Sequence, residues 1–241
     1  MVLKRATLAV SNLSKAREFY GEILGLKIQE SDRGLYISNS ALELIEIKAR
    51  HPAGTYVYHV ALRVPNRSAL GAFLKRVLEF EEVIEGFANH LVSEAIYLRD
   101  FDRIGIEIYV DKPKYQWPRD SNGNIIMDTQ YLDVKSLLQI AKAQPTTTVE
   151  LGHIHMRTTK IEEVEEFYKG LGFRTTGHWI GAIFMAYGDY HHHIAFNNWP
   201  IPRPKDGTGL LEIRLLLPIK RIIDPLGIEL IGESIANQSL G

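Results

Sequence analysis

The chain contains no cysteine, which excludes disulfides, thiolate metal sites and a cysteine nucleophile. No apolar run reaches the roughly 18 residues that a membrane-spanning helix needs. The first ten residues, MVLKRATLAV, hold no long apolar core before a cleavage site, so we expect no signal peptide. The formal net charge is only -1, and no basic surface argues for nucleic acid or an anionic membrane as a partner. We therefore expect a cytoplasmic protein.

What the chain does contain is internal repetition. Its 241 residues are 45% hydrophobic, which suits one compact protein with a sizeable core in one or two domains. The first unit is predicted to be a strand, a helix and three strands, over residues 3–10, 14–24, 27–30, 34–38 and 41–47. The same order is predicted from His59, over residues 59–64, 68–80, 82–84, 90–98 and 105–110.

A third unit begins at His153, where HIHMRTTKIEEVEEFYKGLGF parallels RATLAVSNLSKAREFYGEILGL, and the strand HHHIAF closes it. A fourth begins at Leu210 and is cut short, because DPLGIELIG follows LLEIRLLLP almost at once. We predict that it keeps only a first and a last strand. The chain is thus divided into module 1 (1–50), module 2 (55–112), a connector (113–148), module 3 (149–198) and a truncated module 4 (208–232).

The strand pattern gathers polar residues on one face. Side chains alternate between the two faces of a sheet, and HVALRV, GIEIYV and HIHMR each place apolar residues on one side. Four ionisable residues take the other side: His59, Glu107, His153 and His155. A lone histidine on a strand is most often structural, but a buried Glu without a partner costs roughly several kcal/mol. A metal-binding hollow is therefore the interpretation that we favour.

Two stretches carry a resemblance to a known group. His90, Ile96-Tyr97, Asp100 and Glu107 match the extradiol signature of His, apolar-Tyr, an acidic position and Glu, although Phe101 replaces its usual Pro and Arg103 its usual Gly. YHHHIAFNNW resembles the stretch with the acid–base histidine. The sequence is similar to the vicinal-oxygen-chelate group of glyoxalases, antibiotic-resistance proteins and extradiol dioxygenases, and specifically to the catechol 2,3-dioxygenase type.

This resemblance implies an α+β fold in which repeated βαβββ modules form curved mixed sheets around a metal-binding hollow. It also implies that a first-strand His of one module joins a first-strand His and a last-strand Glu of its partner. Arg5 and Leu210 fill the first-strand positions of modules 1 and 4, and neither can serve. The expected ligands are His59, Glu107 and His153, which form one set only if modules 2 and 3 pair and module 4 closes against module 1.

The function implied is an extradiol dioxygenase that uses non-haem Fe(II), with Mn, Ni or Zn as other candidate metals, to insert O2 into a small aromatic diol. His192 would be the acid–base residue, Tyr97 would bind the ionised substrate oxygen, and His90 would support it. Strand alternation instead favours His191 and His193 facing the hollow, so His193 is kept as the alternative to His192.

Two other functions remain open from the sequence. One is a glyoxalase-like isomerase or lyase, although such sites usually hold a second carboxylate where this chain has HHH. The other is a protein that binds an aromatic ligand without chemistry, which the truncated module 4 makes credible. Exposed sheet edges at that module also leave room for a homo-oligomer.

Overall fold

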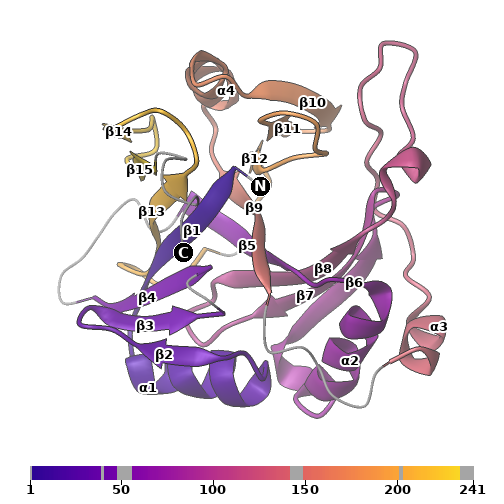
Figure 1. The fold of residues 1–241 in the computed structure, drawn as a ribbon, viewed down its shortest axis with the longest axis vertical. Coiled ribbons are helices and arrows are strands. Elements are labelled where there is room, and N and C mark those ends of the chain that lie inside the picture. The colour runs from indigo at the N-terminus through magenta and orange to yellow at the C-terminus, as the bar shows by residue number, and fades with distance from the viewer. Residues whose placement is uncertain (1, 39–40, 48–55, 142–148, 201–202, 234–241) are drawn as a thin grey trace, which may run out of the picture.

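The computed structural model describes residues 2–38, 41–47, 56–141, 149–200 and 203–233, which form an α+β fold of two curved mixed sheets (Figure 1). One sheet has the strand order β14-β15-β13-β1-β4-β3-β2. Its strands are β1 (Leu3–Val10), β2 (Ile28–Glu30), β3 (Gly34–Ile37), β4 (Leu42–Glu46), β13 (Gly209–Leu215), β14 (Arg221–Ile223) and β15 (Glu229–Gly232).

The second sheet has the order β10-β11-β12-β9-β5-β8-β7-β6. Its strands are β5 (Val57–Arg63), β6 (Ile84–Asn89), β7 (Ser93–Arg99), β8 (Gly105–Asp111), β9 (Glu150–Arg157), β10 (Arg174–Trp179), β11 (Ala182–Ala186) and β12 (Ile194–Asn197).

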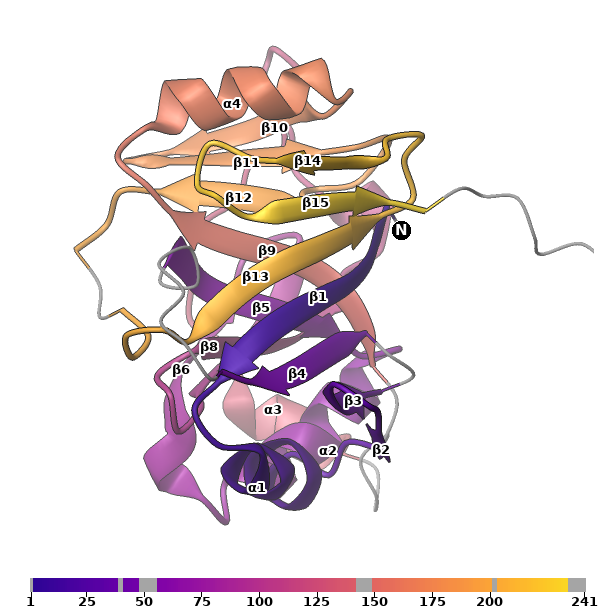
Figure 2. The ribbon, with the colours of Figure 1, turned by 90° about the vertical axis from the view of Figure 1, so that its left-hand side faces the viewer.

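The two sheets pair the modules as expected. Strand β5 of module 2 runs antiparallel to β9 of module 3, and β1 of module 1 runs antiparallel to β13 of module 4. Figure 2 shows β1 in indigo beside β13 in yellow, so a strand of module 1 and a strand of module 4 are neighbours in one sheet. The module boundaries stay predictions, and residues 48–50 and 142–148 lie outside the described residues.

Helices cover the outer faces of the sheets (Figure 1). They are α1 (Leu13–Ala16), continued by the π-helical η1 (Arg17–Ile23), α2 (Arg67–Val77), α3 (Val134–Gln139) and α4 (Ile161–Gly170). Asn12 and Asn66 cap α1 and α2, where each side chain accepts a backbone N–H of the first turn. Among the described residues, no helix is long and apolar enough to cross a membrane.

Strand alternation separates an apolar core from a polar hollow. Val60 and Leu62 of β5, Ile106 and Ile108 of β8 and Ile154 of β9 belong to one buried cluster beneath the helices. The residues between them point to the opposite face. The predicted division into a packed face and a polar face is therefore confirmed, and it places His59, Glu107 and His153 together on the polar face.

Two equivalent turns join the modules. The buried Asp100 carboxylate accepts the N–H groups of Asp102 and Ile104, and it also accepts the hydroxyl of Tyr20 from module 1. Arg103 in this turn has φ +62°, the left-handed region that glycine adopts most easily. The acidic position of the signature thus closes a turn and lies outside the polar hollow.

Asp224 repeats the arrangement in module 4, where it accepts N–H groups of Leu226 and Ile228 and the hydroxyl of Tyr168. Module 4 also differs from the prediction, because β14 stands between its first and last strands. Arg221–Ile223 is the edge strand of this sheet and pairs with β15, whose hydrogen-bonding groups on that side would otherwise be open.

Two predicted strands start later than expected. Residues 82–84 were predicted as a strand, but Glu81–Val83 is a 3₁₀ turn and the strand runs from Ile84. His90 was predicted on the next strand, which begins only at Ser93. His90 lies in the hairpin turn before it, where Asn89 accepts the N–H of Leu91 and Leu91 has φ +70°. A local side-chain bond and a left-handed residue outweigh the strand pattern here.

The strand HHHIAF also begins late, at Ile194. His191–His193 form a bent segment before it, so strict alternation does not apply to the three imidazoles. The backbone still joins the sheet, since the His193 carbonyl accepts the N–H of Ile154 at 2.9 Å. The three side chains make contacts in different directions, to Asp111 from His191 and to the Tyr187 N–H from His193.

Candidate metal centre

Three neighbouring strands bring His59, Glu107 and His153 together. Ala61 of β5 lies between Glu107 of β8 and His153 of β9 in the strand register, and His59 precedes Ala61 by two positions on the same face. Opposed side chains on adjacent strands have Cβ atoms about 4.5–5.5 Å apart. Residues distant in sequence therefore converge because β5 is the central strand of the three.

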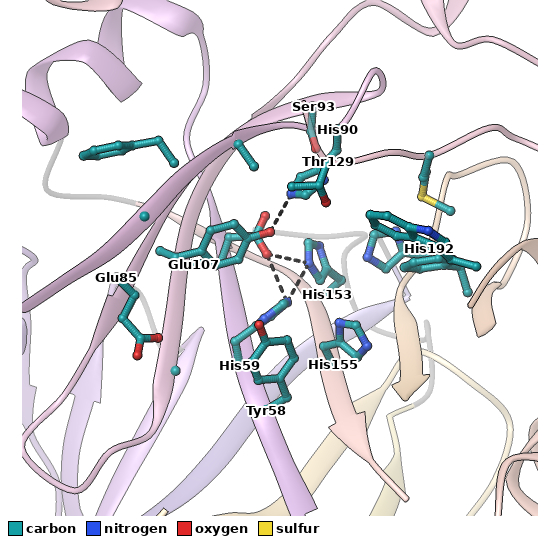
Figure 3. Close-up of a pocket in the computed structure, with 18 of the residues that line it drawn as sticks. Tyr58, His59, Glu85, His90, Ser93, Glu107, Thr129, His153, His155 and His192 are labelled. Atoms are coloured by element: carbon teal, nitrogen blue, oxygen red, sulfur yellow. Dashed lines mark hydrogen bonds and ion pairs between the residues drawn. The ribbon is translucent and has the colours of Figure 1, made fainter. Parts of the chain in front are cut away.

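The donor atoms nearly touch (Figure 3). The Oε2 atom of Glu107 lies 3.0 Å from Nε2 of His59 and 3.1 Å from Nε2 of His153, and the two nitrogens are 3.4 Å apart. All three side chains are buried. Gly105 lies opposite His59, where a Cβ would stand 2.3 Å from the Tyr58 carbonyl oxygen, so the close approach of β8 to β5 requires glycine.

The charges at the centre are set by burial and by the contacts between the three groups. Burial opposes ionisation of Glu107, but His153 and His59 outweigh it and hold the pKa of the Glu107 carboxyl well below its usual value. Burial lowers the pKa of His153 to about 4, although Glu107 opposes the change. At neutral pH the site therefore holds a carboxylate and at least one neutral imidazole.

This donor set fits a divalent cation. One ligand atom from each of the three residues lies within 4.8 Å of the other two. Two imidazole nitrogens and one carboxylate oxygen on one side of an ion match the facial arrangement of non-haem Fe(II) oxygenases, which leaves positions open for small ligands. The buried carboxylate also lacks a fixed positive charge among these contacts, and an ion would supply one.

Tyr97 and His90 form a second pair in the wall of the hollow. Tyr97 of β7 stands beside Glu107 in the register, and its hydroxyl donates to Nε2 of His90 at 2.6 Å. The other ring nitrogen of His90 donates to the Asp128 carbonyl oxygen at 2.7 Å. Burial raises the pKa of Tyr97 well above its usual value, so its phenol keeps its proton at neutral pH.

The structure distinguishes the three consecutive histidines by position. The centroid of the His192 ring lies 4.1 Å from that of the His153 ring. His192 lines the same cavity as the three candidate ligands. His191 is buried behind it and bonds to Asp111. His193 stacks against Tyr190, 4.8 Å between centroids, and lines a different cavity. His192 is the one that faces the predicted metal.

The cavity has a volume of about 300 Å³, at the small end of ligand pockets, which span about 300–1,000 Å³. Its aromatic walls come from Tyr58, Phe87, Trp179, Phe184 and Trp199. Of the described residues that line it, none is Lys or Arg, and the acidic ones are Glu85 and Glu107. The arrangement suits a small, flat, uncharged molecule.

Several residues of the site were not predicted. Trp179 and Trp199 are on loops or strand ends, and the sequence could not place them against a ligand. His155 was expected in the hollow and lines the cavity, but its Nε2 accepts the amide N–H of Asn197 at 2.9 Å. Asp111 was missed because the strand was ended at Val110. Alternation from Glu107 would have placed it on the polar face.

A counterpart of the hollow lies in the other sheet. Thr7 pairs with Glu43 and Glu212 as Ala61 pairs with Glu107 and His153. The position equivalent to His153 is thus Glu212, and the prediction of Leu210 was wrong by two residues. A bulge that skips Leu211 in β13 matches the bulge at Gly152 in β9.

Internal pairs occupy this counterpart instead of an ion. Glu43 accepts the Thr7 hydroxyl at 3.0 Å and lies 3.6 Å from Arg33, while Arg214 bonds Glu212 at 2.8 Å. Arg5 takes the place of His59 and stacks over the Tyr36 ring. Arginine cannot give up its proton in proteins, so this set does not offer the donor atoms that a cation site needs.

Comparisons with known proteins identify the family and agree with the fold. Residues 2–108 match the Glyoxalase/Bleomycin resistance protein/Dioxygenase superfamily. The chain is 33% identical over 239 residues to Catechol-2,3-dioxygenase of Bacillus subtilis (strain 168), with 91% of this chain and 84% of that protein covered.

Two solved structures show the same fold at low identity. Glyoxalase I from Zea mays superimposes with a TM-score of 0.55 at 13% identity, covering 95% of this chain and 90% of that chain. The cppA protein from Streptococcus pneumoniae TIGR4 gives a TM-score of 0.56 at 13% identity, covering 98% and 100%.

Proposed function

Because the chain belongs to the glyoxalase/bleomycin resistance/dioxygenase superfamily, we propose that it is an extradiol dioxygenase of the catechol 2,3-dioxygenase type. The reaction would insert both atoms of O2 into a catechol and cleave the ring beside the diol, giving a 2-hydroxymuconic semialdehyde-type product. The observation that carries the proposal is the convergence of His59, Glu107 and His153 at the floor of a small aromatic cavity. The relative at 33% identity, named as such a dioxygenase, supports it.

We propose Fe(II) as the metal, held by Nε2 of His59, Nε2 of His153 and a carboxylate oxygen of Glu107. When bound, Fe(II) would supply a Lewis acid for the diol and a redox centre for O2. The protein contributes the ionised Glu107, whose negative charge offsets part of the charge of the ion. The neutral imidazole of His153 is ready to serve as a ligand without first losing a proton to solvent.

His192 is proposed as the acid–base residue, because its ring faces the cavity next to His153. Burial lowers the pKa of His192 well below its usual value, and the neighbouring His153 lowers it further. The imidazole is therefore neutral at the start, as a base must be to take the proton of a catechol hydroxyl. Once protonated, it would return that proton later in the turnover.

Tyr97 is proposed to bind the ionised substrate oxygen. In the free protein its hydroxyl proton points to His90, and His90 already uses its own N–H on the Asp128 carbonyl. The hydroxyl would have to rotate from His90 to the substrate. His90 then acts as the resting acceptor that keeps the Tyr97 hydroxyl at the cavity wall until a substrate arrives.

Anaerobic loading with Fe(II), followed by catechol and air, tests the proposal. We expect one O2 consumed per catechol and a yellow product that absorbs in the visible range. Parallel loading with Mn(II), Ni(II) and Zn(II) identifies the active metal. His153→Ala should lose both bound metal and colour, whereas His192→Asn should keep the metal and lose turnover.

His193→Asn is the matched control, because His193 adjoins His192 in sequence but lines a different cavity. It should keep both metal and turnover. Stoichiometric Fe(II) binding without O2 uptake for any catechol would contradict the proposal and favour a protein that only binds an aromatic ligand. Loss of activity in His193→Asn with normal activity in His192→Asn would reverse the assignment of the acid–base residue.

A further inference from the structure

A chain of hydrogen bonds leads from the proposed active site into the protein. His192 lines the cavity, and its Nδ1 lies 2.7 Å from Nδ1 of His191. The other nitrogen of His191, Nε2, lies 2.8 Å from Oδ1 of Asp111. His191 and His192 are buried, and Asp111 belongs to β8, four residues after Glu107. The same strand thus supplies the predicted ligand and the end of this chain.

The donors and acceptors in this chain have only one arrangement when both imidazoles are neutral. An ionised carboxylate only accepts hydrogen bonds, so His191 must carry its proton on Nε2. Its Nδ1 is then an acceptor, and His192 must donate to it from its own Nδ1. The single proton of His192 is thereby held on Nδ1, and its Nε2 has a free lone pair.

Asp111 is fixed in the charged form that this order requires. Burial raises the pKa of its carboxyl, but the hydrogen bonds from His191, Tyr190 and Arg63 outweigh burial and leave the pKa below its usual value. Arg63 donates to Oδ2 at 3.1 Å, and the Tyr190 hydroxyl lies 3.0 and 2.9 Å from the two oxygens. Because Arg63 binds Oδ2, the other oxygen, Oδ1, is left to accept from His191.

The ring of His191 is held as firmly as the carboxylate. It is enclosed by Tyr190 and Trp117, with centroids 4.1 and 5.1 Å away. The Thr176 hydroxyl donates to the His191 carbonyl oxygen. Rotation of the imidazole to exchange its two nitrogens would break both hydrogen bonds and disturb this packing. The arrangement transmits the orientation of Asp111 to the cavity.

We propose that Asp111, acting through His191, is a positioning residue that fixes the tautomer of His192 and makes its Nε2 the atom that accepts the substrate proton. This inference rests on the proposed function, since it assigns His192 the acid–base role. It adds two residues, Asp111 and His191. Neither is hydrogen-bonded to a candidate metal ligand, and neither lines the cavity proposed for the substrate. Removal of either should impair proton transfer while leaving metal and substrate binding in place.

The decisive variant is Asp111→Asn. The guanidinium of Arg63 only donates, so the amide oxygen should stay at the Oδ2 position beside it, and the amide NH2 should face His191. Donation to Nε2 of His191 forces the proton of His191 onto Nδ1. His192 then has to accept at Nδ1 and carry its proton on Nε2, where a base needs a lone pair.

The expected result for Asp111→Asn is a loss of about 100- to 10,000-fold in kcat, the usual worth of general acid–base catalysis. The Fe(II) content and the KM for catechol should change less than threefold. Tyr190→Phe removes a hydrogen bond to the same carboxylate but leaves it an acceptor, so its kcat should stay within about threefold of wild type. Equal losses in the two variants would indicate a structural effect and overturn the proposal.

His191 provides a rescue experiment. A glutamine side chain can accept from His192 with its oxygen and donate to Asp111 with its amide nitrogen, so His191→Gln should retain at least a tenth of the wild-type kcat. His191→Leu fills similar space without hydrogen bonds and should fall as far as Asp111→Asn. Equal kcat values for His191→Gln and His191→Leu would refute the proposal that Asp111 fixes the tautomer of His192 through hydrogen bonds of residue 191.

A readout without turnover separates this inference from the proposed function. Long-range ¹⁵N–¹H NMR of the metal-free protein reports which ring nitrogen carries the proton. We expect His192 protonated on Nδ1 in the wild type and on Nε2 in Asp111→Asn. Wild-type His192 protonated on Nε2 would overturn the inference even if the protein cleaves catechol. The expected NMR pattern in a protein that cleaves no catechol would instead count against the proposed function alone.

Discussion

Acid should destabilise the protein in part through one buried histidine outside the proposed catalytic set. His193 is only 3% exposed, and burial together with the neighbouring His191 lowers its pKa to about 3. An unfolded histidine has a pKa of about 6.5. As the pH falls below 6.5, the unfolded chain takes up this proton and the folded protein does not. The stability present above pH 6.5 is lost progressively as the pH falls toward 3.

The magnitude follows from the gap between the two pKa values. One such group changes the free energy of unfolding by about 1.4 kcal/mol per pH unit in this window. Between pH 6.5, where half of the unfolded chains already carry this proton, and pH 4.5 the loss due to His193 alone should be ~2.3 kcal/mol. His193→Asn removes the titrating group and keeps an acceptor for the Tyr187 N–H, which His193 Nδ1 accepts at 3.3 Å.

Urea unfolding of the metal-free protein, followed by circular dichroism at pH 6.5 and 4.5, measures this difference. Wild type should lose ~2.3 kcal/mol more than His193→Asn over that interval. His178→Asn is the control, because His178 is exposed and its removal should leave the wild-type pH dependence in place. Identical losses for wild type and His193→Asn would refute the reasoning that burial keeps this imidazole neutral.

Four further outcomes are expected. Burial raises the pKa of Asp100 to about 7, so the protonated group stabilises the protein below pH 4 and this stabilisation is lost as the pH rises to 7. In Asp100→Asn, the free energy of unfolding measured with urea should fall less steeply over this range, by about 1.4 kcal/mol per pH unit. Arg103 has φ +62°, a conformation that costs an L-residue about 1–2 kcal/mol. After the entropy of glycine is subtracted, Arg103→Gly should raise the free energy of unfolding by about 0.5–1 kcal/mol, whereas Arg103→Ala should not raise it. Gly152→Ala would place a Cβ 1.9 Å from the Tyr109 hydroxyl and should destabilise the protein by about 1–3 kcal/mol in the same assay. The described cavity wall includes Glu85 and no Lys or Arg, so kcat/KM for 4-methylcatechol should exceed that for 3,4-dihydroxybenzoate at least tenfold, and equal values would contradict this account of the cavity.

The predicted ligand residues could be found from sequence because they lie on regular strands. A period of two is enough to put His59, Glu107 and His153 on one face, and the repeat frame shows which strands are equivalent. The family resemblance implied that one ligand set spans two modules. Because Arg5 and Leu210 cannot serve as ligands, that implied set was complete only if modules 2 and 3 pair.

The same period failed wherever the backbone leaves the strand. Alternation favoured His191 and His193, but the bent segment turns His192 to the cavity. A strand that ran through His90 was interrupted by the turn at Asn89 and Leu91. Such local bonds depend on side-chain directions in the folded chain, and the sequence pattern does not encode them.

The contacts of Asp111 illustrate a second limit. His191 and Asp111 are 80 positions apart, and they meet because β9 and β12 bring module 3 against β5 and β8. Sequence alternation can place Asp111 on the polar face, but its partner depends on the packing of two modules. The misplaced equivalence of Leu210 has another cause, because a shift of two residues along a strand leaves the sequence alternation unchanged.

The counterpart hollow around Glu43 and Glu212 has a consequence for how this protein can evolve. Side chains of the chain itself, Arg33 and Arg214, supply the positive charges around these two acids. The hollow in the other sheet carries the proposed chemistry. Substitutions around Glu43 and Glu212 should therefore act on stability, and substitutions around His59, Glu107 and His153 on activity.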